Sequence, residues 1–511
     1  MKMDPPITRR GPATQAAWLA AAKFIALATS LVIPLLLVRK LSETEFGLYK
    51  QAFQILSTML SLLVLQMSAS AYYFFPREPA KRGQVAFNVL LFYVALGTLV
   101  AVCFALFPHW ITGVFQGNDL QPYVPLIGLA ILLWLSASNL EAVIIANGEV
   151  GTAAVLIVVT QLIKTVFLLS AVVIFGDLRR ILLAAIAYGA VHLLLILIYL
   201  RYRFGRFWRP FDWPLCKAQM ANALPFGVGY MAFAAQSDLH NYFVSYYFPA
   251  AIFAIYSVGS FQLPPLMLLL DSMGTILLPE VARLAHAGDH PGIIRVWLNA
   301  MRQLAFIFVP ACALLFVLRY ELMTVLFPSN YLGAAPIFAV SLLMALVGIN
   351  LSGPMLRAFD ELKTFHMRLC FLLLPLSWAG FYIGMRVAGL VGVMAAMVVG
   401  RAVVAGITWM VIARKLGMSR VDLRYLAPGL RIGASAAVAA LVTFGVKQWL
   451  APLQTGAVLV ISSALFGVIY LTVAFAAGAV TKSEKAELRR AWLKFNRFKA
   501  ARAELSSAPD V

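Results

Sequence analysis

Residues 84–107 have the sequence QVAFNVLLFYVALGTLVAVCFALF, a mostly apolar run without a charged side chain. A helix needs about 20 mostly apolar residues to cross a membrane, because each residue advances about 1.5 Å through a hydrocarbon core about 30 Å thick. The run is therefore long enough to span a bilayer as one helix. Its apolar residues are continuous and do not alternate with polar ones, which argues against a strand of a β-barrel.

Similar apolar runs follow one another along the whole chain. The sequence contains fourteen of them, numbered here as predicted spans 1 to 14: 16–38, 46–68, 84–107, 122–146, 152–175, 181–200, 222–247, 252–278, 299–318, 333–356, 365–386, 389–413, 427–447 and 455–478. The first run is longer than the apolar region of a signal peptide, so we expect it to remain as span 1. The pattern predicts an all-α polytopic membrane protein with about 14 transmembrane helices.

The composition excludes several other classes of protein. Of 511 residues, 62% are hydrophobic and 12% are charged, whereas a soluble domain is about half apolar and a quarter charged. A water-soluble enzyme, a disordered chain and a fibrous repeat are excluded, as is a single-span receptor, which would need a long polar domain. The four cysteines are far apart and do not have metal-ligand spacing, so we expect free thiols and no metal or other cofactor.

The net charge of +20 has a simple explanation in the membrane. With the N-terminus inside, thirty lysine and arginine residues fall on the inner side of the predicted spans and seven on the outer side. Loops on the cytoplasmic side carry such an excess of positive charge. The alternation predicts both termini in the cytoplasm, here of a bacterial inner membrane, and makes nucleic-acid binding an inferior explanation of the charge.

Two short segments recur at nearly the same distance. Phe46-Gly-Leu-Tyr49 in span 2 matches Phe253-Ala-Ile-Tyr256 in span 8, and Ala146–Thr152 after span 4 matches Ala358–Thr364 after span 10. The offsets of 207 and 212 residues predict duplication of a six-span unit in the same orientation, as in transporters built of parallel repeats. The expected domains are an N-lobe, a linker with a C-lobe, spans 13 and 14, and a basic tail: 1–205, 206–415, 416–480 and 481–511.

Basic segments flank these units. Residues 201–209 (RYRFGRFWR) are expected to form a cytoplasmic linker with aromatic side chains at the membrane interface. The tail from Lys482 to Leu505 carries eight cations and three anions, with Leu488, Trp492, Phe495 and Phe498 at helical spacing. The pattern predicts an amphipathic helix on the inner leaflet.

The segment Leu41-Ser-Glu-Thr-Glu-Phe-Gly-Leu-Tyr49, with Leu326-Phe-Pro-Ser-Asn-Tyr331 and Ala334-Ala-Pro336, resembles sequences of the Wzx-type polysaccharide flippase family. That family belongs to the same superfamily as the multidrug (MATE) exporters and the lipid II flippase. The resemblance covers spans 1 to 12. It implies two six-helix lobes around a central cavity lined mainly by spans 1, 2, 7 and 8, plus two extra C-terminal helices. It also implies alternating access, with a lipid-pyrophosphate-linked oligosaccharide as substrate.

Charged side chains inside the spans are the candidate functional residues, because burying a charge in a membrane is costly. The cations are Lys23, Lys50, Lys164 and Arg401. A pyrophosphate needs fixed cations, so we expect these four to bind substrate, with Lys23 and Lys50 passing the phosphates across the cavity. Lys50 lies near the outer interface and is alternatively an anchor, and Arg401 is alternatively a brace of the second lobe.

The acidic and histidine side chains within spans are candidates for ion coupling. They are Asp238, His240, Asp271 and Glu141. Asp238-Leu-His240 is typical of a proton relay, while Glu141 is alternatively the partner of Lys164 in a structural pair. The adjacent Pro264 and Pro265 predict a hinge in span 8. No nucleophile triad, nucleotide-binding loop or zinc motif is present in the sequence, so we do not expect an enzyme.

These observations predict a flippase that moves undecaprenyl-pyrophosphate-linked oligosaccharide from the cytoplasmic to the periplasmic leaflet. Membrane lipids and the polysaccharide polymerase machinery are the expected partners besides the substrate. A cation-coupled multidrug exporter and a lipid II flippase are alternatives with the same fold. A polysaccharide polymerase or ligase is disfavoured, because the longest outer loop, 108–121, is too short for glycan chemistry.

Overall fold

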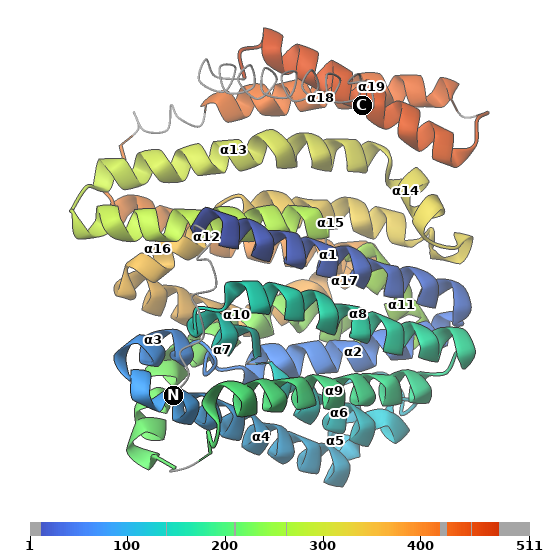
Figure 1. The fold of residues 1–511 in the computed structure, drawn as a ribbon. Coiled ribbons are helices and arrows are strands. Elements are labelled where there is room, and N and C mark those ends of the chain that lie inside the picture. The colour runs from blue at the N-terminus through green and yellow to red at the C-terminus, as the bar shows by residue number, and fades with distance from the viewer. Residues whose placement is uncertain are drawn as a thin grey trace, which may run out of the picture.

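The computed structural model describes residues 12–138, 140–208, 211–261, 263–419, 427–450 and 452–479. Every regular element in this part of the chain is a helix (Figure 1). The predicted tail helix at 482–505 lies outside the described residues. The elements are α1 (Pro12–Lys40), α2 (Glu43–Leu63), α3 (Ser70–Arg77), η1 (Pro79–Lys81), α4 (Arg82–Leu106), α5 (Pro108–Thr112), η2 (Gln121–Tyr123), α6 (Val124–Ala137), α7 (Leu140–Ala146), α8 (Val150–Ile174), α9 (Leu178–Phe204), α10 (Trp213–Tyr247), α11 (Ala250–Gly259), α12 (Pro264–His286), α13 (His290–Val317), α14 (Arg319–Leu326), η3 (Ser329–Tyr331), α15 (Ala334–Gly348), α16 (Ser352–Ala358), α17 (Asp360–Lys415), α18 (Ala427–Trp449) and α19 (Thr455–Ala476).

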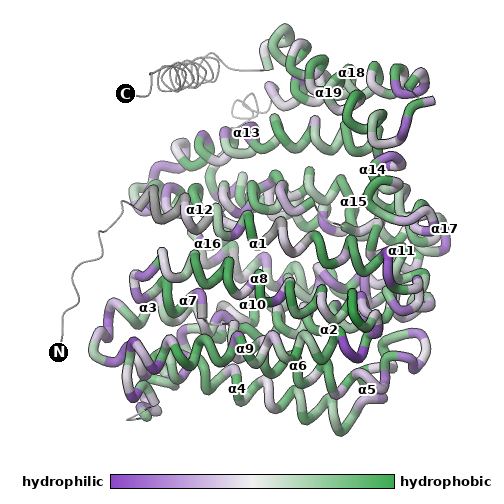
Figure 2. The backbone as a smooth tube through the Cα atoms, turned by 45° about the vertical axis from the view of Figure 1, so that its right-hand side comes forward, coloured by the Kyte–Doolittle hydropathy of each residue, from purple (hydrophilic) through white to green (hydrophobic). Residues whose placement is uncertain are grey.

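The long helices lie roughly side by side, and their middles are apolar while polar residues gather at their ends (Figure 2). Ten helical segments of the described chain are long and apolar enough to cross a membrane. They cover predicted spans 3 to 6 and 8 to 14, with spans 11 and 12 inside one segment. Spans 1, 2 and 7 correspond to α1, α2 and α10. The total of fourteen crossings stays a prediction.

Helix α17 is a hairpin of two helices. Ala388 and Gly389 have non-helical backbone angles, and Gly389 has a φ of +57°, which glycine adopts without steric penalty. A Cβ on Gly384 would overlap the backbone of Gly392, so the two arms touch directly. Lys415 at the end of the second arm pairs with Glu361 at the start of the first. The turn falls between predicted spans 11 and 12.

Predicted span 8 is wrong as a single helix over 252–278. The chain forms α11 up to Gly259 and begins α12 only at Pro264. Proline has no backbone N–H and disfavours helical geometry in the residue before it, and Leu263 is extended, with φ −77° and ψ 106°. The two prolines thus start a new helix, and the break replaces the expected hinge within a helix.

The order of the elements supports the internal duplication. The first half (residues 12–204) and the second half (residues 213–415) each contain a broken helix pair, α2–α3 and α11–α12, and later another, α6–α7 and α15–α16. The starts of α4 and α13 are 208 residues apart, and those of α8 and α17 are 210 apart. Glu149 pairs with Arg203, and Glu361 with Lys415, so both partners are displaced by 212 residues.

Helices α18 and α19 form a layer at one edge of the molecule, beside α13 (Figure 1). The Tyr470 hydroxyl donates to the Phe306 carbonyl at 2.9 Å. Lys447 pairs with Glu321 at 3.0 Å and donates to the Val317 carbonyl, also at 3.0 Å. These contacts fasten the last two helices to the second half. All four cysteines are free thiols, as predicted.

Candidate functional site

A cavity of about 650 Å³ opens among α1, α10, α12, α15, α16 and α17. Four charged side chains line it: Lys23, Asp271, Arg357 and Arg401. Three cations face one carboxylate there, so the wall carries a net positive charge. We call this space the basic cavity. Its lining comes mostly from the second half, and α2, which the family resemblance implied as a lining helix, does not contribute.

Lys23 is held in place by an ion pair with Glu141. Its Nζ lies 2.9 Å from Oε1 of Glu141, and both side chains are partly exposed. Helix α1 packs along α8, and α7, which carries Glu141, packs on the same helix. The expected pairing of Glu141 with Lys164 is therefore wrong, because α1 lies close enough to bring a different lysine to the carboxylate. Lys164 instead lies over the Trp134 ring, 4.7 Å from its centroid.

Arg401 enters the basic cavity from the second arm of α17. Its guanidinium carbon lies 4.5 Å from the centroid of the Phe233 ring, a distance at which a cation is attracted to the ring face. His366, from the first arm, also lines the cavity, and its Nδ1 lies 3.1 Å from Oγ1 of Thr408. The hairpin thus places a stacked arginine and a histidine in one wall.

Two basic lining residues, Arg357 and His366, are not among the predicted site residues. Arg357 directly follows predicted span 10 on the inner side, and His366 lies near the start of predicted span 11. In the structure both face the basic cavity. The signal that could have found Arg357 is its place in the short helix α16, directly before the recurring segment at Ala358.

Lys50 does not line the basic cavity. Its Nζ lies 5.4 Å from the centroid of the Phe46 ring, within the same helix. Lys23 and Lys50 therefore do not share one space in this conformation. Of the four predicted substrate-binding cations, the structure brings Lys23 and Arg401 together and leaves Lys50 and Lys164 elsewhere.

Asp238 and His240 have different surroundings, although both are on α10. Oδ2 of Asp238 accepts a hydrogen bond from Oγ1 of Thr58 at 2.5 Å. His240 is buried, and its Nδ1 lies 2.8 Å from the Tyr256 hydroxyl. Residues two apart on a helix point in different directions, so the two side chains do not form a continuous relay here. Gln54 donates to Thr58 at 3.0 Å and extends the Asp238 contact along α2.

The two signature segments meet at the end predicted to face outward. Nδ2 of Asn330 donates to Oε1 of Glu43 at 2.8 Å, and the Phe46 and Tyr331 rings pack edge to face at 5.9 Å. Gly47 packs against the backbone of Ala250, so closely that a Cβ would overlap its carbonyl oxygen. These contacts join the first half to the second, and we call them the outer closure.

The comparisons with known proteins agree with this architecture. The family model described as "Polysaccharide biosynthesis protein" matches residues 13–283, more than half of the chain. None of the curated protein sequences matches the chain. Among solved structures, the lipid II flippase MurJ in an inward closed conformation is similar at a TM-score of 0.65 and 12% identity, covering 90% of this chain and 98% of that one.

Multidrug transporters have the same fold. A MATE family transporter of the MOP superfamily in an inward-facing conformation aligns at a TM-score of 0.62 and 13% identity, over 77% of this chain and 98% of that one. An outward-facing MATE transporter of that superfamily aligns at a TM-score of 0.57 and 16% identity, over 80% of this chain and 97% of that one. The match and the apolar helices confirm a multi-pass membrane protein. The chain belongs to the polysaccharide biosynthesis protein family.

Proposed function

We propose that this protein is a flippase that carries undecaprenyl-pyrophosphate-linked oligosaccharide from the cytoplasmic to the periplasmic leaflet of the bacterial inner membrane. The observation that carries this proposal is the cationic wall of the basic cavity. A pyrophosphate is multiply anionic, and guanidinium and ammonium groups supply charge-assisted hydrogen bonds that replace its water. The family match supports a role in polysaccharide biosynthesis, and the fold is shared with the lipid II flippase MurJ.

Lys23, Arg357 and Arg401 are the residues that we assign to the pyrophosphate, since all three line the same cavity. Glu141 positions Lys23 through their ion pair. Asp271 is the one carboxylate among the described residues of the lining, and it limits the positive charge that a bound pyrophosphate must neutralise. We place Lys50 on the later part of the route, near the outer end of α2, where it receives the phosphates after the cavity changes face.

The positions of the outer closure and of the basic cavity support alternating access. The outer closure joins the halves at the predicted periplasmic end. The lining includes Arg357, which lies after predicted span 10 on the predicted cytoplasmic side. We infer that this conformation loads from the cytoplasm. Separation of Phe46 from Tyr331, with closure around Lys23, would release the substrate on the other side.

Asp238 is the strongest candidate for ion coupling, because its carboxylate bonds to Thr58 across the contact of α10 with α2. Protonation would change this bond when the halves move. Asp238→Asn keeps an acceptor oxygen but removes the titratable proton, so we expect slower flipping in vesicles and no response to a pH gradient. Asp119→Asn is the matched control, because Asp119 is exposed and lines neither the basic cavity nor any candidate coupling contact. Wild-type flipping that is unchanged when the gradient is collapsed at constant membrane potential would exclude proton coupling.

Deletion of the gene tests the function itself. Two pools are measured: polysaccharide at the cell surface and lipid-linked oligosaccharide in the inner membrane. The proposal expects loss of the first and build-up of the second, and the glycan that builds up identifies the substrate. If lipid II accumulates instead, the protein serves cell-wall synthesis. If both pools are unchanged and only drug sensitivity rises, a multidrug exporter replaces this proposal.

A further inference from the structure

A second cavity, of about 450 Å³, lies apart from the basic cavity, at the predicted cytoplasmic end of the first half. Its walls are the start of α4, the turn between α7 and α8, and the end of α9. Three arginines and one glutamate line it: Arg82, Arg203, Arg206 and Glu149. We call it the arginine pocket. None of its residues lines the basic cavity.

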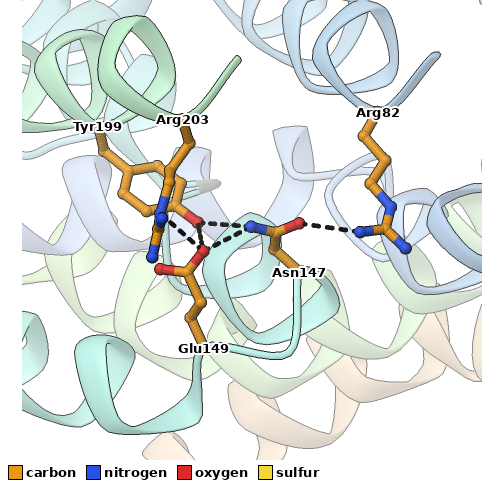
Figure 3. Close-up of polar contacts among 5 residues, drawn as sticks. All are labelled: Arg82, Asn147, Glu149, Tyr199 and Arg203. Carbon is orange, nitrogen blue, oxygen red and sulfur yellow. Dashed lines mark hydrogen bonds and ion pairs between the residues drawn. The ribbon is translucent and has the colours of Figure 1, made fainter. Parts of the chain in front are cut away.

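The carboxylate of Glu149 is committed to one of these arginines. Its Oε1 lies 3.0 Å from Nε of Arg203 and also accepts from Nδ2 of Asn147 at 2.6 Å (Figure 3). Oδ1 of Asn147 points to the other side and lies 3.4 Å from Nη1 of Arg82. Arg82 otherwise donates to the Phe75 carbonyl. Arg206 forms no hydrogen bond or ion pair with the part of the chain that the structure describes. Two positive charges thus face the pocket without a carboxylate.

Comparison of the two halves shows which residues of the arginine pocket belong to the repeated framework and which do not. The pair of Glu149 and Arg203 recurs in the second half as Glu361 and Lys415, so it belongs to the repeated framework. Arg82 opens α4, and the residue that opens α13 is His290. At the 212-residue offset, Arg206 corresponds to Met418. The framework folds without these two arginines, which therefore need another explanation.

Uncharged hydrogen-bonding groups of the pocket restrict the kinds of ligand that it can bind. The first turn of α4 has no side-chain cap, and the start of a helix attracts anions. The neighbouring Lys81 is already paired with Asp212 at 2.8 Å, and its hydrogen bond lowers the pKa of Asp212. Oε1 of Gln84, which lines the pocket, is buried and lacks a hydrogen-bond partner among the described residues. Rotation of the side chain would turn this oxygen into the pocket, where it can accept from a hydroxyl group.

We propose that the arginine pocket binds a phosphate group that carries a neighbouring hydroxyl, as in a glycerol phosphate headgroup. Arg82 and Arg206 bind the phosphate, and Gln84 accepts from the hydroxyl. Basic pockets between membrane helices on the cytoplasmic side bind acidic lipid headgroups. Phe204 and Phe207 also line the pocket and offer apolar contact at that surface. The same chemistry is present in phosphatidylglycerol and in free glycerol 3-phosphate.

Native mass spectrometry of the purified full chain in detergent tests the proposal. Phosphatidylglycerol, phosphatidylcholine and glycerol 3-phosphate are added separately. We expect bound phosphatidylglycerol in preference to phosphatidylcholine. In R82Q/R206Q we expect an apparent affinity at least about tenfold lower than that of the wild type, because the variant loses two charge-assisted hydrogen bonds to the phosphate. Binding of glycerol 3-phosphate without the lipid would make the ligand a soluble one at the same site.

The matched control is R77Q/R201Q. It removes two arginines that stack on Tyr73 and Trp208 near the same end of the bundle and do not line the pocket. We expect this variant to bind as the wild type does, and both variants to have wild-type melting temperatures. The proposal is overturned if R82Q/R206Q binds normally, or if the control loses as much. Failure here leaves the flippase proposal untouched, because that proposal rests on the basic cavity.

Discussion

Replacing Arg401 by glutamine should lower the affinity for the lipid-linked oligosaccharide about ten- to a hundredfold. Arg401 lines the basic cavity and is stacked on Phe233, so its guanidinium is held ready for a phosphate. A hydrogen bond to a charged group contributes about 1.5–3 kcal/mol, and each 1.4 kcal/mol corresponds to a factor of ten. Cells that carry this variant should lose surface polysaccharide and accumulate the lipid-linked precursor.

The measurement is flipping of the lipid-linked oligosaccharide in vesicles, together with the amount that copurifies with the protein. Arg401→Lys should retain part of the activity, because lysine keeps the charge but loses the bidentate geometry. Arg386→Gln is the matched control: Arg386 lies over the Tyr382 ring on the same hairpin and outside the cavity. It should behave as the wild type does.

The alternative role of Arg401, as a brace of the second half, predicts a different pattern. A brace would lower the melting temperature of the purified protein in step with activity. A substrate contact would lower retention of the substrate while the melting temperature stays within a few degrees of the wild-type value. Normal flipping by the glutamine variant would remove Arg401 from the site.

The sequence predicted the helices far better than the site. Apolar runs place the spans, because in lipid a backbone must satisfy its own hydrogen bonds and a helix does so locally. The turn at Ala388 and Gly389 falls between two such runs. Where the prediction of span 8 failed, the cause was local and visible in the sequence, namely Pro264 and Pro265.

The site could not be predicted in the same way, because it depends on which helices touch. Lys23 and Lys50 are on neighbouring helices in sequence, yet only Lys23 reaches the basic cavity. Lys23 pairs with Glu141 because α1 and α7 both pack on α8. Helices α1 and α8 are far apart in the sequence, so the sequence alone did not indicate this pair. Arg357 follows an apolar run and resembles an ordinary cation of a cytoplasmic loop in the sequence. In the folded protein it lines the basic cavity.

Replacing Gly47 by valine should abolish transport by preventing the outer closure. A Cβ on Gly47 would overlap the carbonyl oxygen of Ala250, and valine adds two further methyl groups. Backbone atoms cannot move aside as a flexible side chain can, so α2 and α11 must separate. The contact between the Phe46 and Tyr331 rings would be lost when these helices separate. The protein would then stay open outward and could not complete a cycle.

The separation can be measured directly through Ala254, which lies one helical turn after Ala250 and is fully buried. In a chain without its exposed Cys103, Ala254→Cys should react with an impermeant maleimide from outside much faster when Gly47→Val is also present, because the wild-type closure opens only transiently. Gly445→Val is the matched control, because a Cβ there meets open space.

Wild-type transport by Gly47→Val would show that the close contact of α2 with α11 is not required at any step. Loss of transport without new labelling would mean that the closure persists and that the substitution acts elsewhere. The combination of both results, lost transport and labelled Ala254→Cys, is the one that ties the signature segment Leu41–Tyr49 to gating, since that segment supplies Glu43, Phe46 and Gly47 to the contact.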